Sequence, residues 1–121
     1  MKHTNARKVK ADGYTFASKA EYERYLSLKD MQKYGHIKGL EVHPHFTFEV
    51  NGRKVGRGYT ADFRYVTGGD FSRFQEVVED VKGRTFLDWP LRRDLFRACY
   101  PSIEFRIIRK TREGFETEVV K

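Results

Sequence analysis

At 121 residues, the chain is long enough for one domain with one hydrophobic core and too short for two. Aromatic residues make up 15% of it, which argues against a disordered chain. Its formal net charge of +7 favours a polyanionic partner such as nucleic acid, and its single cysteine, Cys99, excludes an internal disulfide and any multi-cysteine zinc site.

Residues 1–12 are basic and polar, and we predict that they form a flexible N-terminal arm. Such an arm could follow phosphates on DNA, although a frayed terminus explains the same composition. The remaining residues, 13–121, are expected to form the single domain. No signal peptide opens the chain and no apolar run reaches membrane-spanning length, so a soluble, cytoplasmic protein is expected, with no membrane partner.

The first predicted helix runs from Ser18 to about Tyr34, because residues 18–21 have the capping-box pattern and Gly35 favours a helix end. Glu21 borders the face that is expected to point to the core. It is therefore either a capping residue or a carboxylate that reaches a functional site. The residues predicted to face the core are Tyr22, Tyr25 and Leu26.

Three strands are predicted next, over residues 46–50, 59–65 and 74–82. The first two alternate apolar and polar residues, and Asn51-Gly52 is a typical hairpin turn. The third has apolar residues on both faces, which predicts a central strand that is covered on both sides. Alternation places Asp80 and Lys82 on one face of this strand and Glu79 on the other.

A second helix is predicted from Asp88 or Trp89 to Tyr100, followed by a strand over residues 103–107. Residues 74–108 can therefore form a parallel strand–helix–strand crossover. The last dozen residues hold Gly114 and a stretch from Thr117 to Val120, which is either a short edge strand or a loose tail. These elements predict an α/β fold in the order α-β-β-β-α-β, with a mixed central sheet flanked by helices.

The main chemical feature is Asp62 on one strand and Asp80-x-Lys82 on the next. If these strands pair, Asp62 and Asp80 come close enough to share a Mg²⁺ ion, which prefers oxygen ligands. Lys82 could then hold an attacking water or stabilise the transition state. The same pattern also fits a surface ion pair, but an unpaired charge on a central strand is costly and needs a reason.

The basic residues have two interpretations, a solvated surface or a set of contacts to DNA phosphates beside the acid cluster. We favour the second, and the predicted DNA-binding residues are Arg53, Lys54, Arg57, Arg84, Arg93 and Arg97. His43 and His45 flank Pro44 with no third nitrogen or sulfur ligand nearby, and they are predicted to be loop or strand-start residues. The absence of a glycine-rich phosphate loop argues against a nucleotide cofactor.

Several short motifs follow one another in a specific order between residues 10 and 108. With them, the chain resembles a family of small phage and prophage nucleases (formerly domain of unknown function 1064) in the PD-(D/E)XK superfamily, which also holds archaeal-type Holliday junction resolvases. The motifs are DGYTF at 12–16, SKAE at 18–21, Arg24-Tyr25, YTADF at 59–63, VEDVKG at 78–83, Leu95-Phe96, Tyr100-Pro101 and the strand 103–108.

The resemblance implies a restriction-endonuclease-like fold, with a mixed sheet flanked by helices. Glu21, Asp62 and Asp80, together with Val81, would hold one or two Mg²⁺ ions, for which Mn²⁺ would substitute. Lys82 would position the water that hydrolyses the phosphodiester, leaving a 5′-phosphate and a 3′-hydroxyl. One departure is Tyr59, which stands where archaeal resolvases often have a serine.

We therefore expect a Mg²⁺-dependent, structure-specific DNA endonuclease that acts as a homodimer on branched DNA, most specifically a Holliday junction resolvase. Two alternatives remain: a less specific branched-DNA or nicking endonuclease, and a non-catalytic nucleic-acid-binding module on the same fold. The set of Glu21, Asp62, Asp80 and Lys82 argues against the last, because a pure binder gains nothing from acids beside phosphates.

Overall fold

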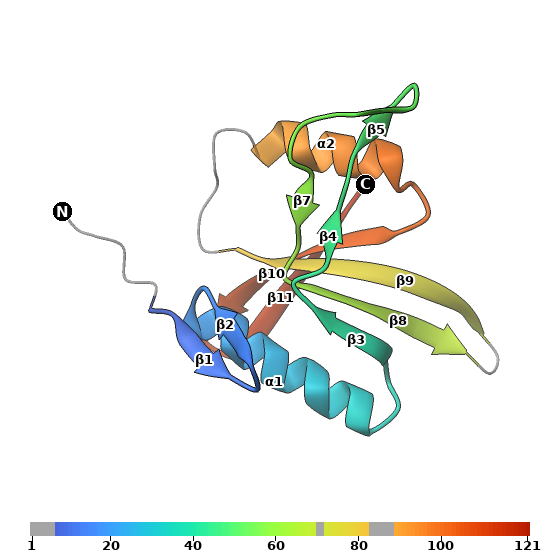
Figure 1. Cartoon of the computed structure of the whole chain (residues 1–121). Coiled ribbons are helices and arrows are strands. Elements are labelled where there is room, and N and C mark those ends of the chain that lie inside the picture. The colour runs from blue at the N-terminus through green and yellow to red at the C-terminus, as the bar shows by residue number, and fades with distance from the viewer. Residues whose placement is uncertain (1–6, 70–71, 83–88) are drawn as a thin grey trace.

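The computed structural model describes residues 7–69, 72–82 and 89–121, and its centre is a five-stranded mixed sheet (Figure 1). Helix α1 (Lys19–Lys33) packs on one face of the sheet and α2 (Trp89–Cys99) on the other. In the described part of the chain, neither helix combines the length and apolar character that a membrane crossing needs. The chain is thus a layered α/β structure.

The strand order in this sheet is β11-β10-β9-β8-β3. The pair β9 and β10 is parallel and the other neighbours are antiparallel. Because α2 lies between β9 and β10 in the chain, the predicted parallel crossover is confirmed. The bounds are β3 (Lys38–Val42), β8 (Phe63–Gly69), β9 (Ser72–Val81), β10 (Glu104–Thr111) and β11 (Gly114–Val120).

Two small elements lie outside the sheet. Strands β1 (Val9–Ala11) and β2 (Tyr14–Phe16) form a hairpin beside the start of α1 (Figure 1). Residues 44–61, which we call the wing, leave the sheet and return to it. Within the wing, β4 (His45–Phe46) pairs with β7 (Tyr59–Thr60), and β5 (Glu49–Val50) pairs with β6 (Arg53–Lys54).

The core consists of two apolar clusters, one on each face of the sheet. Neighbouring residues of β9 point to different clusters, Val78 to the α2 side and Val77 to the α1 side, as expected for a strand covered on both faces. On the α2 side, Phe96 packs against wing residues Phe46 and Tyr59. The wing is therefore held by aromatic contacts with α2 and, through Tyr59, with Phe105 of β10.

Helix α1 begins and ends as predicted. The Ser18 side chain accepts a hydrogen bond from the Glu21 amide, and Gly35 adopts a φ of +82° that glycine tolerates best. The predicted core face was partly wrong, because Leu26 is 41% exposed while Tyr25 and Leu28 are buried. The buried positions recur every three or four residues, so they follow the side of α1 that lies on the sheet.

Several predicted boundaries differ from the structure. Residues 9–12 belong to the β1–β2 hairpin rather than to a flexible arm, because the Asp12 carboxylate accepts bonds from Tyr25 and Lys29. The arm residues 1–6 lie outside the described part of the chain. The stretch from Thr117 to Val120 belongs to the longer edge strand β11, which already begins at Gly114, and is not a loose tail.

The predicted order α-β-β-β-α-β is incomplete. Its first strand, 46–50, is broken into two short wing strands, and its second, 59–65, is interrupted between β7 and β8. The sheet uses β3 instead, which lacks regular alternation and contains Gly39 at a φ of +65° with a register shift between Lys38 and Glu41. Counting only elements of the main sheet and its helices, the order is α1, β3, β8, β9, α2, β10, β11.

Candidate active site

The end of β9 carries the Asp80-x-Lys82 pair. As predicted, both side chains leave the same face, and the Lys82 ammonium donates a short charge-assisted hydrogen bond to Oδ2 of Asp80. Both side chains are mostly buried, with exposed fractions of 13% for Lys82 and 11% for Asp80. Beyond the last strand residue, the Lys82 amide still donates to the Ile108 carbonyl at 2.9 Å, which holds this end against β10.

Asp62 lies opposite Asp80, just before β8 begins. The antiparallel register of β8 and β9 pairs Phe63 with Glu79. The next residues, Asp62 and Asp80, therefore face each other across the two neighbouring segments. The Asp62 amide donates to the Glu79 carbonyl at 3.2 Å, and the Val81 amide donates to Oδ2 of Asp62 at 2.6 Å. The predicted approach of Asp62 to Asp80 is therefore present in the fold.

The surroundings of Asp62 oppose its negative charge. Burial raises the pKa of this carboxyl well above its ordinary value, and the neighbouring charges of Asp80 and Glu21 raise it further. The hydrogen bond from Val81 acts in the opposite direction but does not outweigh these effects. The buried hydroxyl of Tyr59 also adjoins the cluster, and burial together with the charges of Asp80 and Asp62 raises its pKa. Added positive charge would stabilise this group of acids.

Glu21 reaches the same cluster from the first turn of α1. Its Oε1 accepts a hydrogen bond from the Ala17 amide at 2.9 Å, and its Oε2 contacts Nε2 of His43 at 2.7 Å. The residue is only 3% exposed. The capping and functional interpretations are thus compatible, because one carboxylate oxygen binds the chain before the helix while the other faces the acid cluster.

His43 is the residue that the sequence interpretation missed. It stands between β3 and β4, and its amide donates to the Asp62 carbonyl at 2.9 Å. One potential ligand atom each from Glu21, His43 and Asp62 lie within 4.8 Å of one another, a spacing suited to a metal ion. The predicted role as a loop residue was incomplete, since nothing in the His-Pro-His pattern indicates a partner 22 residues earlier in the chain.

Glu79 is separate from this cluster, as alternation predicted. It is completely buried on the α1 side of β9, where Arg24 donates to both of its carboxylate oxygens at 2.8 and 2.6 Å. The hydroxyl of Tyr65 donates to it as well. Adjacent acids on β9 therefore have different environments, a saturated ion pair for Glu79 and an acid cluster for Asp80.

The predicted DNA-binding residues divide into three groups. Arg53, Lys54 and Arg57 are exposed on the wing, whose base carries His43 and Asp62. Arg84 lies outside the described residues. Arg93 and Arg97 are half-buried on α2.

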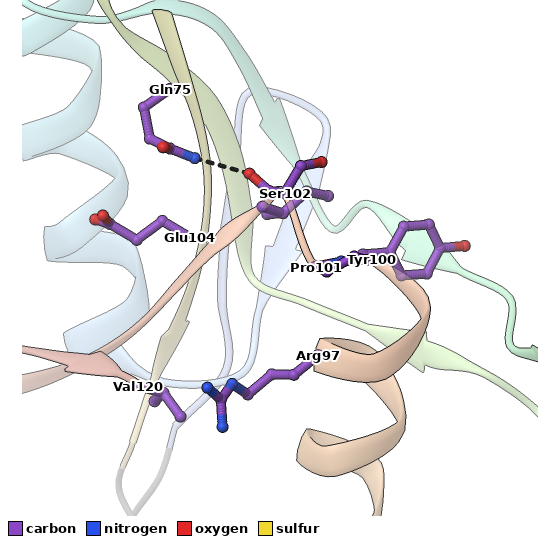
Figure 2. A pocket seen from close by; sticks show the side chains of 8 residues that line it. Gln75, Arg97, Tyr100, Pro101, Ser102, Glu104 and Val120 are labelled. Carbon is purple, nitrogen blue, oxygen red and sulfur yellow. Dashed lines mark hydrogen bonds between the residues drawn. The ribbon is translucent and has the colours of Figure 1, made fainter.

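Arg97 lies far from the acids, at the other end of the sheet. It lines a pocket of about 350 Å³ beside the first residues of β9 and β10, where Gln75 donates to the Ser102 carbonyl at 2.9 Å (Figure 2). Gln75 and Asp80 are five residues apart on an extended strand, which corresponds to about 17 Å. The expected position of Arg97 beside the acid cluster was therefore wrong.

The cluster suits a divalent cation. The carboxylates of Glu21 and Asp80 both act on Asp62, and Lys82 pairs with Asp80. Such a group of acids favours a hard cation with oxygen ligands. Val81 was also predicted as a ligand. Its side chain packs with the α1-side cluster and its amide binds Asp62, so only its carbonyl oxygen could coordinate.

Comparison with known families gives a match to a family model. A family model described as "Protein of unknown function (DUF1064)" covers residues 1–113. No curated protein and no solved structure gives a significant match.

Proposed function

The chain belongs to the DUF1064 family, a family of unknown function, and we propose that it is a divalent-cation-dependent DNA endonuclease of the PD-(D/E)XK type. The observation that carries the proposal is the convergence of Glu21, Asp62, Asp80 and Lys82 at the end of β9. In this proposal the layered arrangement of α1, β3, β8, β9, α2 and β10 is a restriction-endonuclease-like core.

The positions of the acids support phosphodiester hydrolysis over a purely structural role. A structural ion pair needs one acid and one base, as Arg24 and Glu79 provide on the other face of β9. The cluster instead gathers three carboxylates and keeps Asp62 in surroundings that disfavour its charge. Such an arrangement costs stability unless a cation binds, and it is typical of functional sites.

The proposed roles follow from the geometry. Glu21, Asp62 and Asp80 would hold Mg²⁺ or Mn²⁺, which when bound neutralises charge on the scissile phosphate. The Lys82 ammonium, held by Asp80, would orient a water molecule for attack on phosphorus. The water oxygen forms the new bond to phosphorus and the bond to O3′ breaks. The water gives up one proton and O3′ gains one, leaving a 5′-phosphate and a 3′-hydroxyl.

The wing supports DNA as the substrate. Its basic residues Arg53, Lys54 and Arg57 are exposed, and its two ends are tied to the site by the bonds from His43 to Asp62 and from Ala61 to Pro44. The wing extends up to about 20 Å from the site if its residues 44–50 are fully extended. Basic side chains within that distance can bind phosphates other than the one that is cleaved.

The resemblance to junction resolvases supports branched DNA as the substrate and a homodimer as the active form. Cutting two opposed strands of a four-way junction needs two sites, which one copy of this chain does not provide. A resolvase should therefore be dimeric on its substrate, whereas a nicking enzyme can act as a monomer. Light scattering of the chain with and without junction DNA distinguishes these two forms.

The decisive experiment is incubation with Mg²⁺ or Mn²⁺ and a panel of duplex, forked, flapped and four-way DNA. We expect cleavage with 5′-phosphate products, greatest on four-way DNA, and none in the presence of EDTA. Cleavage of all substrates at equal rates would support the less specific nuclease. Binding to DNA without cleavage under any of these conditions would support the non-catalytic module and contradict the proposal.

A further inference from the structure

His43 adds a nitrogen atom to the group of potential metal ligands at the acid cluster. It offers the one nitrogen among the three potential ligand atoms that lie within 4.8 Å of one another, the others being carboxylate oxygens of Glu21 and Asp62. Metal–ligand bonds of about 2.0–2.2 Å place the ligands of one ion up to about 4.4 Å apart. Small side-chain movements would therefore bring all three atoms onto one ion.

His43 is held in place from several directions. Its ring packs against the rings of Tyr14 and Phe16 in the β1–β2 hairpin, with centroid distances of 6.4 and 5.9 Å. Its backbone has a φ of +57°, which few residues other than glycine adopt, and its amide is bonded to the Asp62 carbonyl. These contacts orient the imidazole toward the acids and limit its rotation.

The imidazole also lies on the open side of the cluster. Its side chain is 32% exposed, whereas that of Glu21 is 4% exposed. An ion that enters from solvent would meet His43 together with the carboxylates. The contact between Nε2 of His43 and Oε2 of Glu21 would then be replaced by bonds from both atoms to the ion.

Nitrogen and oxygen donors select different ions. Mg²⁺ prefers oxygen ligands and keeps much of its water shell, whereas imidazole nitrogen suits first-row transition ions. We propose that Glu21, His43 and Asp62 form a mixed nitrogen–oxygen site that binds a first-row transition ion such as Mn²⁺ in preference to Mg²⁺. This inference rests on the proposed function for its biological purpose, but the binding itself can be measured without DNA.

The test uses Mn²⁺ as the probe and the full chain. We expect wild type to bind Mn²⁺ at least about tenfold more tightly than Mg²⁺ by calorimetry. Pulsed electron paramagnetic resonance of the Mn²⁺ complex should show coupling to ¹⁴N. The His43→Asn variant should lose this coupling and about tenfold in Mn²⁺ affinity, while its Mg²⁺ affinity changes by less than about threefold.

Asparagine is chosen because it tolerates a positive φ and supplies an amide oxygen in place of the nitrogen. The matched control is His45→Asn, two residues away, whose imidazole binds Thr60 instead of the acids. It should keep the ¹⁴N coupling. If His43→Asn does not fold, a chain with Asn at His3, His36 and His45 leaves His43 as the only histidine and must keep the coupling.

Mn²⁺ that binds wild type without ¹⁴N coupling, or coupling that survives in His43→Asn, overturns the inference. Equal affinities for Mn²⁺ and Mg²⁺ overturn it as well. These results leave the nuclease proposal intact if DNA is cleaved in Mg²⁺. Conversely, a nitrogen-ligated Mn²⁺ with no cleavage of any DNA supports the mixed site and contradicts the nuclease.

Discussion

The amide of Val81 donates a hydrogen bond to the carboxylate of Asp62 at 2.6 Å, between residues 19 positions apart in the chain. This bond fixes the orientation of an acid whose charge is opposed by burial and by Asp80 and Glu21. Asp62 is therefore held in a position that is unfavourable for the metal-free protein.

Asp62→Asn should stabilise the metal-free protein at neutral pH. Because the pKa of Asp62 is raised on folding, its contribution to stability is present below its unfolded pKa and is lost as pH rises through the folded pKa. The variant lacks this loss, so its advantage in melting temperature over wild type should grow as pH rises above about 4. Each kcal/mol corresponds to about 4 °C for a chain of this size.

Melting curves in EDTA between pH 3 and pH 8 measure this difference. Asp94→Asn, at a side chain that is 66% exposed, is the control and should show no such trend. A variant that melts below wild type at pH 8 would contradict the assigned environment of Asp62.

Lys82→Met should remove cleavage without removing DNA binding. Methionine keeps the length of the side chain and lacks the ammonium that contacts Asp80. We expect the single-turnover cleavage rate to fall by about 10²–10⁴-fold, as for loss of a group that positions a proton or water. The control is Lys33→Met, in the last turn of α1 and at the opposite end of this helix from Glu21, which should cleave at the wild-type rate. Near-normal cleavage by Lys82→Met would exclude Lys82 from the reaction.

Glu79→Gln should destabilise the fold while leaving the chemistry in place. It removes the charge that Arg24 pairs with in a fully buried position, and such a change costs about 3–5 kcal/mol. Urea unfolding measures the loss. Glu118→Gln breaks the exposed pair with Arg109 and should change stability by less than about 1 kcal/mol. At a temperature where both variants are folded, Glu79→Gln should cleave DNA at nearly the wild-type rate.

Replacing the three basic wing residues with alanine should weaken DNA binding, because it removes the electrostatic contribution of their contacts with phosphates. We expect at least about a tenfold loss of affinity and a decrease of about three in the slope of log K against log salt. Fluorescence anisotropy at several salt concentrations gives both values. The control variant replaces Lys33, Lys38 and Arg73, which lie away from the acid cluster, with alanine and so removes the same number of charges. An equal loss of affinity in this control would show that only net charge matters.

Much of the fold could be predicted because local patterns were strong. The caps of α1 and the double-sided apolar pattern of β9 depend on neighbouring residues in the chain, and both were found. Strand β3 has no such pattern, since Gly39 and a register shift interrupt its pairing with β8. It forms a strand because its backbone pairs with β8, and this pairing cannot be read from the sequence of β3 itself.

The candidate site divides in the same way. Asp80 and Lys82 could be paired from strand alternation, and Asp62 from the pairing of consecutive strands. His43 could not be found, because its position depends on a positive φ and on a partner in α1. Arg97 was misplaced because the direction of α2 relative to β9 is a property of the whole crossover.

The wing leaves the site at His43 and returns at Asp62, and the two ends are joined by a backbone bond. Changes in its length or charge between those ends therefore need not move the carboxylates. In the proposed nuclease, substrate choice and bond cleavage can vary independently, and we expect an exchange of wings between family members to transfer DNA preference while conserving the proposed reaction.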